Sequence, residues 1–260
     1  MERVADIVII GGGVIGLSIA YHLGQKKAKK IVLLEKGQLG EGSTSRCVGG
    51  IRTQFSTEIN ILFSLESMKT FDHFEEEFGV NPEFKRIGYL FLATTDQDVK
   101  VFQQNLILQK QFGIPVEWLH PDEIRRRFPY LKMDDILGGT FSPRDGYAGP
   151  SEVLSGFAGG AKRAGVKFYE GVEAKEILVD KGKVTGVRTN GGEISSPVVV
   201  NAGGPYASLV AEMAGLRIPV KPLRRQVFVT APFHLTDQTI PLTIDFNRGW
   251  YFRQEVDGFL

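Results

Sequence analysis

The chain has 260 residues, of which 42% are hydrophobic and 10% aromatic, enough to bury a sizeable core and to form two domains. Its 31 basic and 30 acidic side chains leave a formal net charge of +1, which argues against nucleic acid or an anionic membrane as a partner. A single cysteine excludes an intramolecular disulfide.

The first predicted elements surround a glycine-rich turn. Residues 7–10 (IVII) are β-branched and show no polar alternation, which predicts a strand buried on both faces. Glycines follow in G-x-G-x-x-G spacing at Gly11, Gly13 and Gly16. Apolar side chains then recur at near-helical spacing from Val14 and Ile15 onward, and a second strand over 31–35 ends in Glu35.

This order of strand, glycines, helix, strand and acid predicts a dinucleotide-binding unit. The helix N-terminus would attract phosphates through free amides and its positive dipole end. The carboxylate of Glu35 would accept hydrogen bonds from the ribose hydroxyls. NAD and FAD both carry an ADP moiety, so the motif alone leaves the cofactor open.

The next elements are a loop and one long helix, and from residue 80 to about 145 the pattern leaves the βαβ frame. Residues 36–56 are rich in glycine and hydroxyls and predict a loop, and the periodicity over 57–78 predicts one amphipathic helix that ends at Gly79. Further elements are expected as a strand over 86–95, a helix over 96–113, a strand over 115–119 and a short helix from Pro121.

The second half returns to the first pattern. A helix over 149–165 precedes three apolar runs separated by the turn signals DKGK and NGG, and a buried strand over 198–200 follows. The sequence Asn201, Ala202, Gly203, Gly204 then leads into a helix that starts near Pro205. Two more strands are expected over 223–232 and 249–254.

The predicted fold is α/β, with a β-sheet domain inserted between the parts of a Rossmann-like domain. The Rossmann-like domain is expected to comprise residues 1–80 and 146–215, and the inserted domain residues 81–145 and 216–260. The chain is expected to stop inside the inserted domain, because Asp257 and Gly258 signal a hairpin whose returning strand has two residues.

Several motifs resemble the FAD-dependent amine and amino-acid oxidoreductase family, which includes D-amino-acid oxidase, glycine oxidase and sarcosine oxidase. They are DIVIIGGGVIGLSIAYHL with Glu35, GSTSRCVGGIR, the segment 171–207 and GWYFR, and the stretch GSTSRCVGGIRTQF is most similar to β subunits of sarcosine and proline dehydrogenases. The resemblance implies an FAD-binding domain, a substrate domain, and a C-terminal segment beyond Leu260.

The resemblance also implies the residues that hold the flavin. They are Gly11, Gly13, Val14, Ile15, Gly16, Glu35, Lys36, Gly42, Ser43, Thr44, Ser45, Arg46, Gly49, Gly50, Val172, Ala202, Gly203 and Gly204. The hydroxyls and flexible backbone of 42–50 suit an extended diphosphate and ribityl chain; the alternative is a solvated surface loop. For the Asn201 to Gly204 junction the alternative is a strand-to-helix turn without a ligand.

Four residues are candidates for the substrate site. Arg52 is the expected anchor, because a guanidinium clamps a carboxylate with two parallel hydrogen bonds. Arg46 competes for this role, and either arginine has the alternative of a surface ion pair. Tyr251 and Arg253 alternate along 249–254 and are expected to face one way, over the substrate by resemblance. An ordinary sheet tyrosine is the alternative for Tyr251.

The predicted function is FAD-dependent oxidation of the C–N bond of a small amino acid or N-alkyl amino acid to an imine, by hydride transfer to the flavin. Sarcosine, proline and glycine are the expected substrate types. The alternatives are an NAD-dependent dehydrogenase and a non-catalytic flavin-binding subunit, and a second subunit is a possible partner.

No metal site is expected, because the four histidines lack ligand spacing, and Cys47 is interpreted as an inert small residue. No apolar run reaches the ~20 residues of a membrane span. The N-terminus lacks a signal-peptide pattern, so we expect a cytoplasmic protein.

Overall fold

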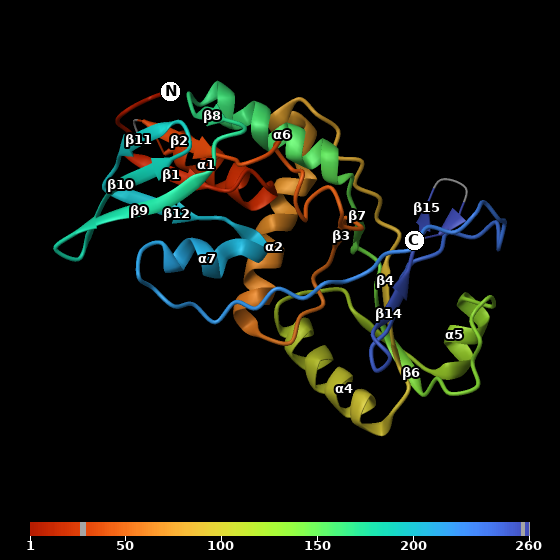
Figure 1. Cartoon of the computed structure of the whole chain (residues 1–260). Helices are drawn as coiled ribbons and strands as arrows, with labels where there is room; N and C mark the ends of the chain where they lie inside the picture. The colour runs from red at the N-terminus through yellow and green to blue at the C-terminus, as the bar shows by residue number, and fades with distance from the viewer. Residues whose placement is uncertain (27–29, 256–257, 260) are drawn as a thin grey trace. The chain divides into compact units, whose positions relative to one another are not determined.

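The computed structural model describes residues 1–26, 30–255 and 258–259 (Figure 1). The chain divides into two compact units. Unit 1 comprises Met1–Cys47, Phe74–Pro82 and Pro150–Arg225, and unit 2 comprises Val48–His73, Glu83–Gly149 and Gln226–Leu260. This division differs from the predicted domain boundaries chiefly in residues 48–73. They were predicted to belong to the Rossmann-like domain, whereas the structure groups them with unit 2.

Unit 1 contains a parallel four-stranded sheet in the order β12-β1-β2-β8. Its strands are β1 (Ile7–Ile10), β2 (Ile31–Leu34), β8 (Lys167–Tyr169) and β12 (Val198–Asn201). β2 is buried throughout, as its unbroken apolar run predicts. The predicted burial of β12 is wrong: Val198 is 46% exposed, because this strand lies at the edge of the sheet.

Two helices of unit 1 pack against each other. They are α1 (Val14–Gln25) and α6 (Pro150–Arg163). Small residues allow close approach: a Cβ on Gly160 of α6 would lie 2.8 Å from the Tyr21 ring of α1. Both helices are predicted from the sequence, the first from its apolar spacing, and both are confirmed.

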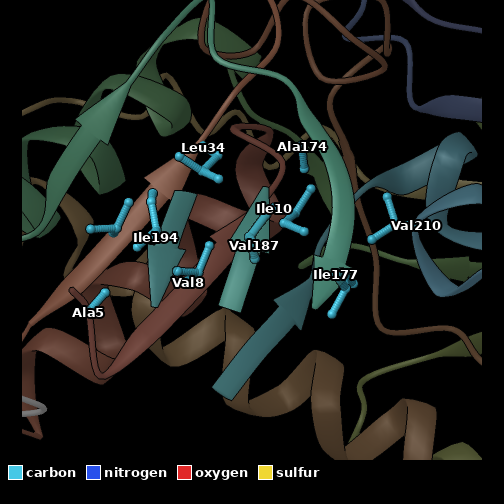
Figure 2. Packing of buried hydrophobic residues seen from close by; sticks show 10 residues of the cluster. Ala5, Val8, Ile10, Leu34, Ala174, Ile177, Val187, Ile194 and Val210 are labelled. Atoms are coloured by element: carbon cyan, nitrogen blue, oxygen red, sulfur yellow. The ribbon is translucent and has the colours of Figure 1, made fainter. Parts of the chain in front are cut away.

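A three-stranded antiparallel sheet covers part of the parallel sheet. It is formed by β9 (Ala174–Asp180), β10 (Lys183–Thr189) and β11 (Gly192–Ser195). Figure 2 shows Val8, Ile10 and Leu34 of the parallel sheet grouped with Ile177, Val187 and Ile194 of the second sheet. The short helices η1 (Gly204–Tyr206) and α7 (Ala207–Glu212) follow β12.

The predicted helix over 57–78 is two helices. α2 (Glu58–Asp72) belongs to unit 2 and α3 (Phe74–Phe78) to unit 1, with the break at His73. Ile61 of α2 packs in a cluster of unit 2 with Ile114, whereas Phe78 of α3 packs against Phe157 of α6. The apolar residues of 57–78 therefore keep one helical spacing but are buried in two separate hydrophobic clusters. Gly79, at φ +70°, ends α3 as predicted.

Unit 2 contains a five-stranded sheet in the order β14-β13-β4-β6-β5. Its strands are β4 (Tyr89–Ala93), β5 (Glu117–Leu119), β6 (Gly138–Ser142), β13 (Leu242–Asp245) and β14 (Trp250–Phe252). The helix α4 (Asp96–Gln111) begins with a capping box, and at the start of α5 (Pro121–Arg127) the His120 amide donates to the Glu123 carboxylate at 2.9 Å. One sheet face, with Tyr89 and Phe91, packs with Phe102 of α4, and the other, with Leu90, packs with Ile124 of α5.

Two strand pairs complete unit 2. β3 (Gly50–Ile51) pairs with β7 (Gly146–Tyr147), and β15 (Gln254–Glu255) pairs with β16 (Gly258–Phe259). The hairpin predicted from Asp257 and Gly258 falls partly on residues 256–257, which lie outside the described residues; the strands β15 and β16 that flank them are paired.

The predicted strand over 223–232 is absent from the described structure. The segment is exposed along its length, including 71% of Leu223 and 75% of Phe228. Valine and phenylalanine favour extended backbone, but a strand needs a ladder partner; here Thr230 makes a single backbone bond to Phe259. No helix within the described chain has the length and apolar character to cross a membrane.

Candidate functional site

The glycine turn of unit 1 requires glycine at two positions. Gly11 has φ +115°, and an added Cβ there would overlap the Ala202 carbonyl oxygen. A Cβ on Gly16 would overlap the Gly11 carbonyl oxygen. The turn is therefore as tight, and the helix as close to it, as the dinucleotide motif demands.

The N-terminus of α1 faces the loop predicted to line a phosphate chain. The Val14 amide donates to the Thr44 hydroxyl oxygen at 3.1 Å, and a Cβ on Gly13 would lie 3.3 Å from the same atom. Further amides at the start of an α-helix have no intrahelical acceptor. Near them the Ile15 side chain is 64% exposed, so this end of α1 presents backbone donors on an open surface.

Other predicted residues of the loop lie at its surface. Ser43, Ser45 and Arg46 are exposed, and nothing lies within 4 Å of a Cβ added to Gly42. Cys47 is also exposed, and its thiol donates to the Thr44 carbonyl at 3.1 Å.

The Glu35 carboxylate is held in position by the backbone. Its Oε2 accepts from the Gly12 amide at 2.7 Å and its Oε1 from the Gly37 amide at 2.9 Å. Each oxygen keeps acceptor capacity for a ribose hydroxyl. The Val172 amide donates to the Glu35 carbonyl at 3.0 Å, so the structure brings these two predicted residues together. Lys36 Nζ lies 3.6 Å from the centre of the Tyr206 ring.

The second junction lies beside the glycine turn, because β12 is the neighbour of β1. The Ala202 amide donates to the Ile10 carbonyl at 2.9 Å. Asn201 fixes the junction by accepting from the Gly203 amide at 3.1 Å and donating to the Ala207 carbonyl at 2.8 Å. Gly204 has φ +53° and open space around it.

This junction also marks where the strand order of the parallel sheet reverses. β2 and β8 lie to one side of β1 and β12 to the other. The carboxyl ends of strands at such a reversal form the usual crevice for a nucleotide. The glycine turn, the oriented Glu35 carboxylate and the second junction therefore fit the ADP part of FAD.

The remaining predicted residues belong to unit 2. Gly49 and Gly50 lie at β3, and a Cβ on Gly50 would overlap the Tyr89 hydroxyl oxygen. Arg52 is half-buried, with its guanidinium carbon 4.7 Å from the Phe55 ring centre and 5.4 Å from that of Phe91. Within the described part of the chain, no acidic side chain pairs with Arg52.

Tyr251 and Arg253 differ in their surroundings. β14 ends at Phe252, so the predicted alternation does not extend to Arg253, and Tyr251 is 38% exposed whereas Arg253 is 6% exposed. The Arg253 guanidinium donates to the carbonyls of Val48 and Gln254, both at 3.0 Å. It also pairs with the Glu255 carboxylate at 2.6 Å and lies 4.0 Å from the Tyr147 ring centre. Arg253 therefore ties together separate segments of unit 2.

Two buried residues near Arg52 were not predicted from the sequence. Burial raises the pKa of Tyr89 to about 12, while the charge of Arg52 opposes that shift. Asp145, fully buried, accepts from the Thr53 hydroxyl at 2.7 Å, and burial raises the pKa of its carboxyl. Tyr89 reads as an ordinary strand residue in the sequence, and no local signal marks Asp145.

A separate hollow of about 390 Å³ lies in unit 2. Its wall includes Thr53, Leu65, Met68 and Arg144, but not Arg52, Tyr89 or Tyr251. We therefore do not place the predicted substrate there. The described residues contain no group of three or more His, Cys, Asp or Glu side chains that could hold a metal ion.

Fold and site together define a dinucleotide-binding α/β protein whose second unit presents Arg52, an arginine that no acidic side chain of the described residues pairs with. The chain belongs to the DAO family of FAD-dependent oxidoreductases, whose family model matches residues 6–260. The predicted family and the FAD cofactor are thereby confirmed.

Curated relatives include two named enzymes and one regulatory subunit. Mitochondrial dimethylglycine dehydrogenase of Rattus norvegicus is 33% identical over 98% of this chain, and sarcosine oxidase subunit beta of Arthrobacter sp is 31% identical over 92%. The mitochondrial pyruvate dehydrogenase phosphatase regulatory subunit of Mus musculus is 30% identical over 98%. The chain spans 30%, 60% and 30% of these proteins, respectively.

Solved structures show the same fold. L-proline dehydrogenase from P. horikoshii matches all of this chain with a TM-score of 0.85 and 33% identity, and 69% of that chain is covered. Glycine oxidase from Geobacillus kaustophilus matches 99% of this chain with a TM-score of 0.82 and 25% identity, and 70% of that chain is covered.

Proposed function

We propose that the protein takes part in FAD-dependent oxidation of the C–N bond of a small amino acid or N-alkyl amino acid to an imine. The named activities of the relatives support this substrate class, since they concern dimethylglycine, sarcosine, proline and glycine. These compounds share a carboxylate beside a carbon that carries nitrogen. Location in the cytoplasm stays a prediction.

Arg52 carries the proposal. A surface arginine would be expected to meet an acid or to extend into water, whereas this guanidinium lies over two aromatic rings without an acidic partner in the described chain. Aromatic faces leave the donors at its edge free, and those donors match the two oxygens of a carboxylate. Arg46 stays a less favoured candidate, because it is exposed and belongs to unit 1.

The chain's own residues would divide the work between binding cofactor and substrate. Gly11, Gly16 and Glu35 would hold the ADP part of FAD, and Arg52 would orient the substrate through its carboxylate. FAD supplies the hydride acceptor when bound. A fixed carboxylate limits the rotation of the amine-bearing carbon, and such positioning can account for a large part of catalysis.

The test is anaerobic bleaching of the flavin absorbance in FAD-loaded protein by sarcosine, dimethylglycine, proline, glycine and D-amino acids. We expect one of these to reduce the flavin, and Arg52→Ala to raise the half-saturating concentration while FAD content stays normal. Arg126→Ala is the matched control, because Arg126 is an exposed arginine of α5 in the same unit. No bleaching by any member of the panel would contradict the proposal.

A second candidate is a flavin-binding subunit without amine oxidation of its own. The similarity to a named regulatory subunit favours it. It predicts stoichiometric FAD and no bleaching by any amine. The NAD-dependent alternative is not favoured, because the family that this chain belongs to is FAD-dependent.

A further inference from the structure

Tyr89 shares a sheet face with Tyr251, one of the residues predicted to meet the substrate. Phe91 lies two residues further along β4 and therefore on the same face. Ile244 of β13 pairs with Phe91, and Tyr251 of β14 pairs with Ile244. Residues paired in register point to one side of a sheet, so Tyr89, Phe91 and Tyr251 form one face, and Arg52 lies over the Phe91 ring.

The Tyr89 hydroxyl is nearly buried but makes no hydrogen bond to any described residue. Tyr89 is 5% exposed, but its hydroxyl oxygen is not completely enclosed by the described residues. It therefore keeps a small opening. Tyr21 gives the contrasting case, because its hydroxyl bonds to Glu77, and Tyr130 gives another, because its hydroxyl is enclosed. Buried polar groups in proteins are usually paired, so an open and unpaired hydroxyl indicates a ligand contact.

Charge and space around this hydroxyl agree with a donor role. Burial raises the pKa of Tyr89 to about 12, with Arg52 the largest opposing influence, so the hydroxyl keeps its proton at physiological pH. The Tyr89 hydroxyl occupies space that is open because residue 50 is glycine. A Cβ on Gly50 would overlap the hydroxyl oxygen but would lie 3.4 Å from the ring carbon that bears it.

We propose that the Tyr89 hydroxyl donates a hydrogen bond to the substrate carboxylate that Arg52 binds. This inference rests on the proposed function and adds a second contact to the same group. Two donors of different kinds on one carboxylate would select for amino acids over simple amines.

The test is a double-mutant cycle in FAD-loaded protein with two measurements. One is the half-saturating concentration for flavin reduction by the best amino acid of the panel, and the other is the dissociation constant of acetate, measured by flavin absorbance. Tyr89→Phe should weaken both about tenfold or more, the scale of a lost hydrogen bond to a charged group. The limiting rate of flavin reduction should change less.

Gly50→Ala should weaken acetate binding in the wild type, because the new Cβ displaces the hydroxyl. In the Tyr89→Phe background the same substitution should have little further effect, because 3.4 Å from Cβ to the ring carbon is an ordinary contact. Tyr130→Phe is the matched control and should leave acetate binding unchanged. Tyr130 packs with the cluster on the other sheet face.

The outcomes separate this inference from the proposal beneath it. If the wild type neither binds acetate nor is reduced by any amino acid, the proposed function fails and this inference with it. If Arg52→Ala weakens acetate binding while Tyr89→Phe does not, the proposed function stands and the role of Tyr89 is overturned. Additive effects of Gly50→Ala and Tyr89→Phe would likewise contradict the stated geometry.

Discussion

Replacing Gly16 by alanine creates a collision that the surrounding structure cannot easily relieve. The added Cβ would overlap the Gly11 carbonyl oxygen and lie 3.1 Å from the Gly11 carbonyl carbon. Both are backbone atoms of a turn fixed by the Gly11 amide, which donates to the Leu34 carbonyl at 2.9 Å. Overpacking costs about 1–3 kcal/mol, and a backbone neighbour puts this case at the upper end. Better helix propensity offsets up to ~1 kcal/mol, so we expect a net loss of about 2 kcal/mol in the free energy of unfolding.

Gly159→Ala is the matched control within the same unit. Gly159 is also a helical glycine, in α6, but its added Cβ would meet only the flexible end of Arg163, at 3.4 Å. This substitution should raise the free energy of unfolding by about 0.5–1 kcal/mol. Urea unfolding of FAD-free protein, followed by circular dichroism, measures both without the stabilisation that a bound ligand adds. Equal effects, or a gain from Gly16→Ala, would refute the reasoning.

Three further predictions concern charged side chains. Glu35→Ala should weaken FAD binding by about 1.5–3 kcal/mol, since it removes hydrogen bonds to a charged group; titration with FAD measures this, and unchanged affinity would contradict it. Arg52→Lys should restore substrate affinity poorly, because lysine lacks the bidentate fork; normal reduction of Arg52→Ala, together with failure of Arg46→Ala, would move the anchor to position 46. Burial raises the pKa of Asp145 above its ordinary value of 3.8, so the folded state favours the protonated acid and loses stability as pH rises above about 4. Asp145→Asn removes that loss. The free energy of unfolding of the variant minus that of the wild type should therefore be larger at about pH 7 than at about pH 4, and a pH-independent difference in urea unfolding would contradict the sign.

The elements that surround the glycine turn could be predicted because their signals are local. The β-branched run of 7–10, the glycine spacing and Glu35 all lie within one supersecondary unit. The helix over 57–78 shows the limit of such reasoning. Its apolar period is continuous, but Ile61 and Phe78 are buried in different cores. Only tertiary packing determines the break at His73.

The segment 223–232 fails as a predicted strand for a related reason. Alternating valine and phenylalanine indicate a preference for extended backbone, but strand formation depends on an adjacent strand supplied from elsewhere in the fold. β12 shows the same dependence in its burial. Its apolar sequence predicts a buried strand, and its position at the edge leaves Val198 half exposed.

The same distinction between local sequence signals and tertiary packing applies to the candidate site. Arg52 could be proposed from the sequence, because a charged residue inside a glycine-rich motif stands out chemically. Tyr89 could not, because in YLFLA it reads as one apolar member of a buried strand. Its relation to Tyr251 arises only from the register of β4, β13 and β14, and the state of its hydroxyl depends on the absent side chain of Gly50. A hydroxyl becomes a candidate ligand contact when the fold nearly buries it, leaves a small opening to it and supplies no partner, and that combination is a property of packing rather than of any local motif.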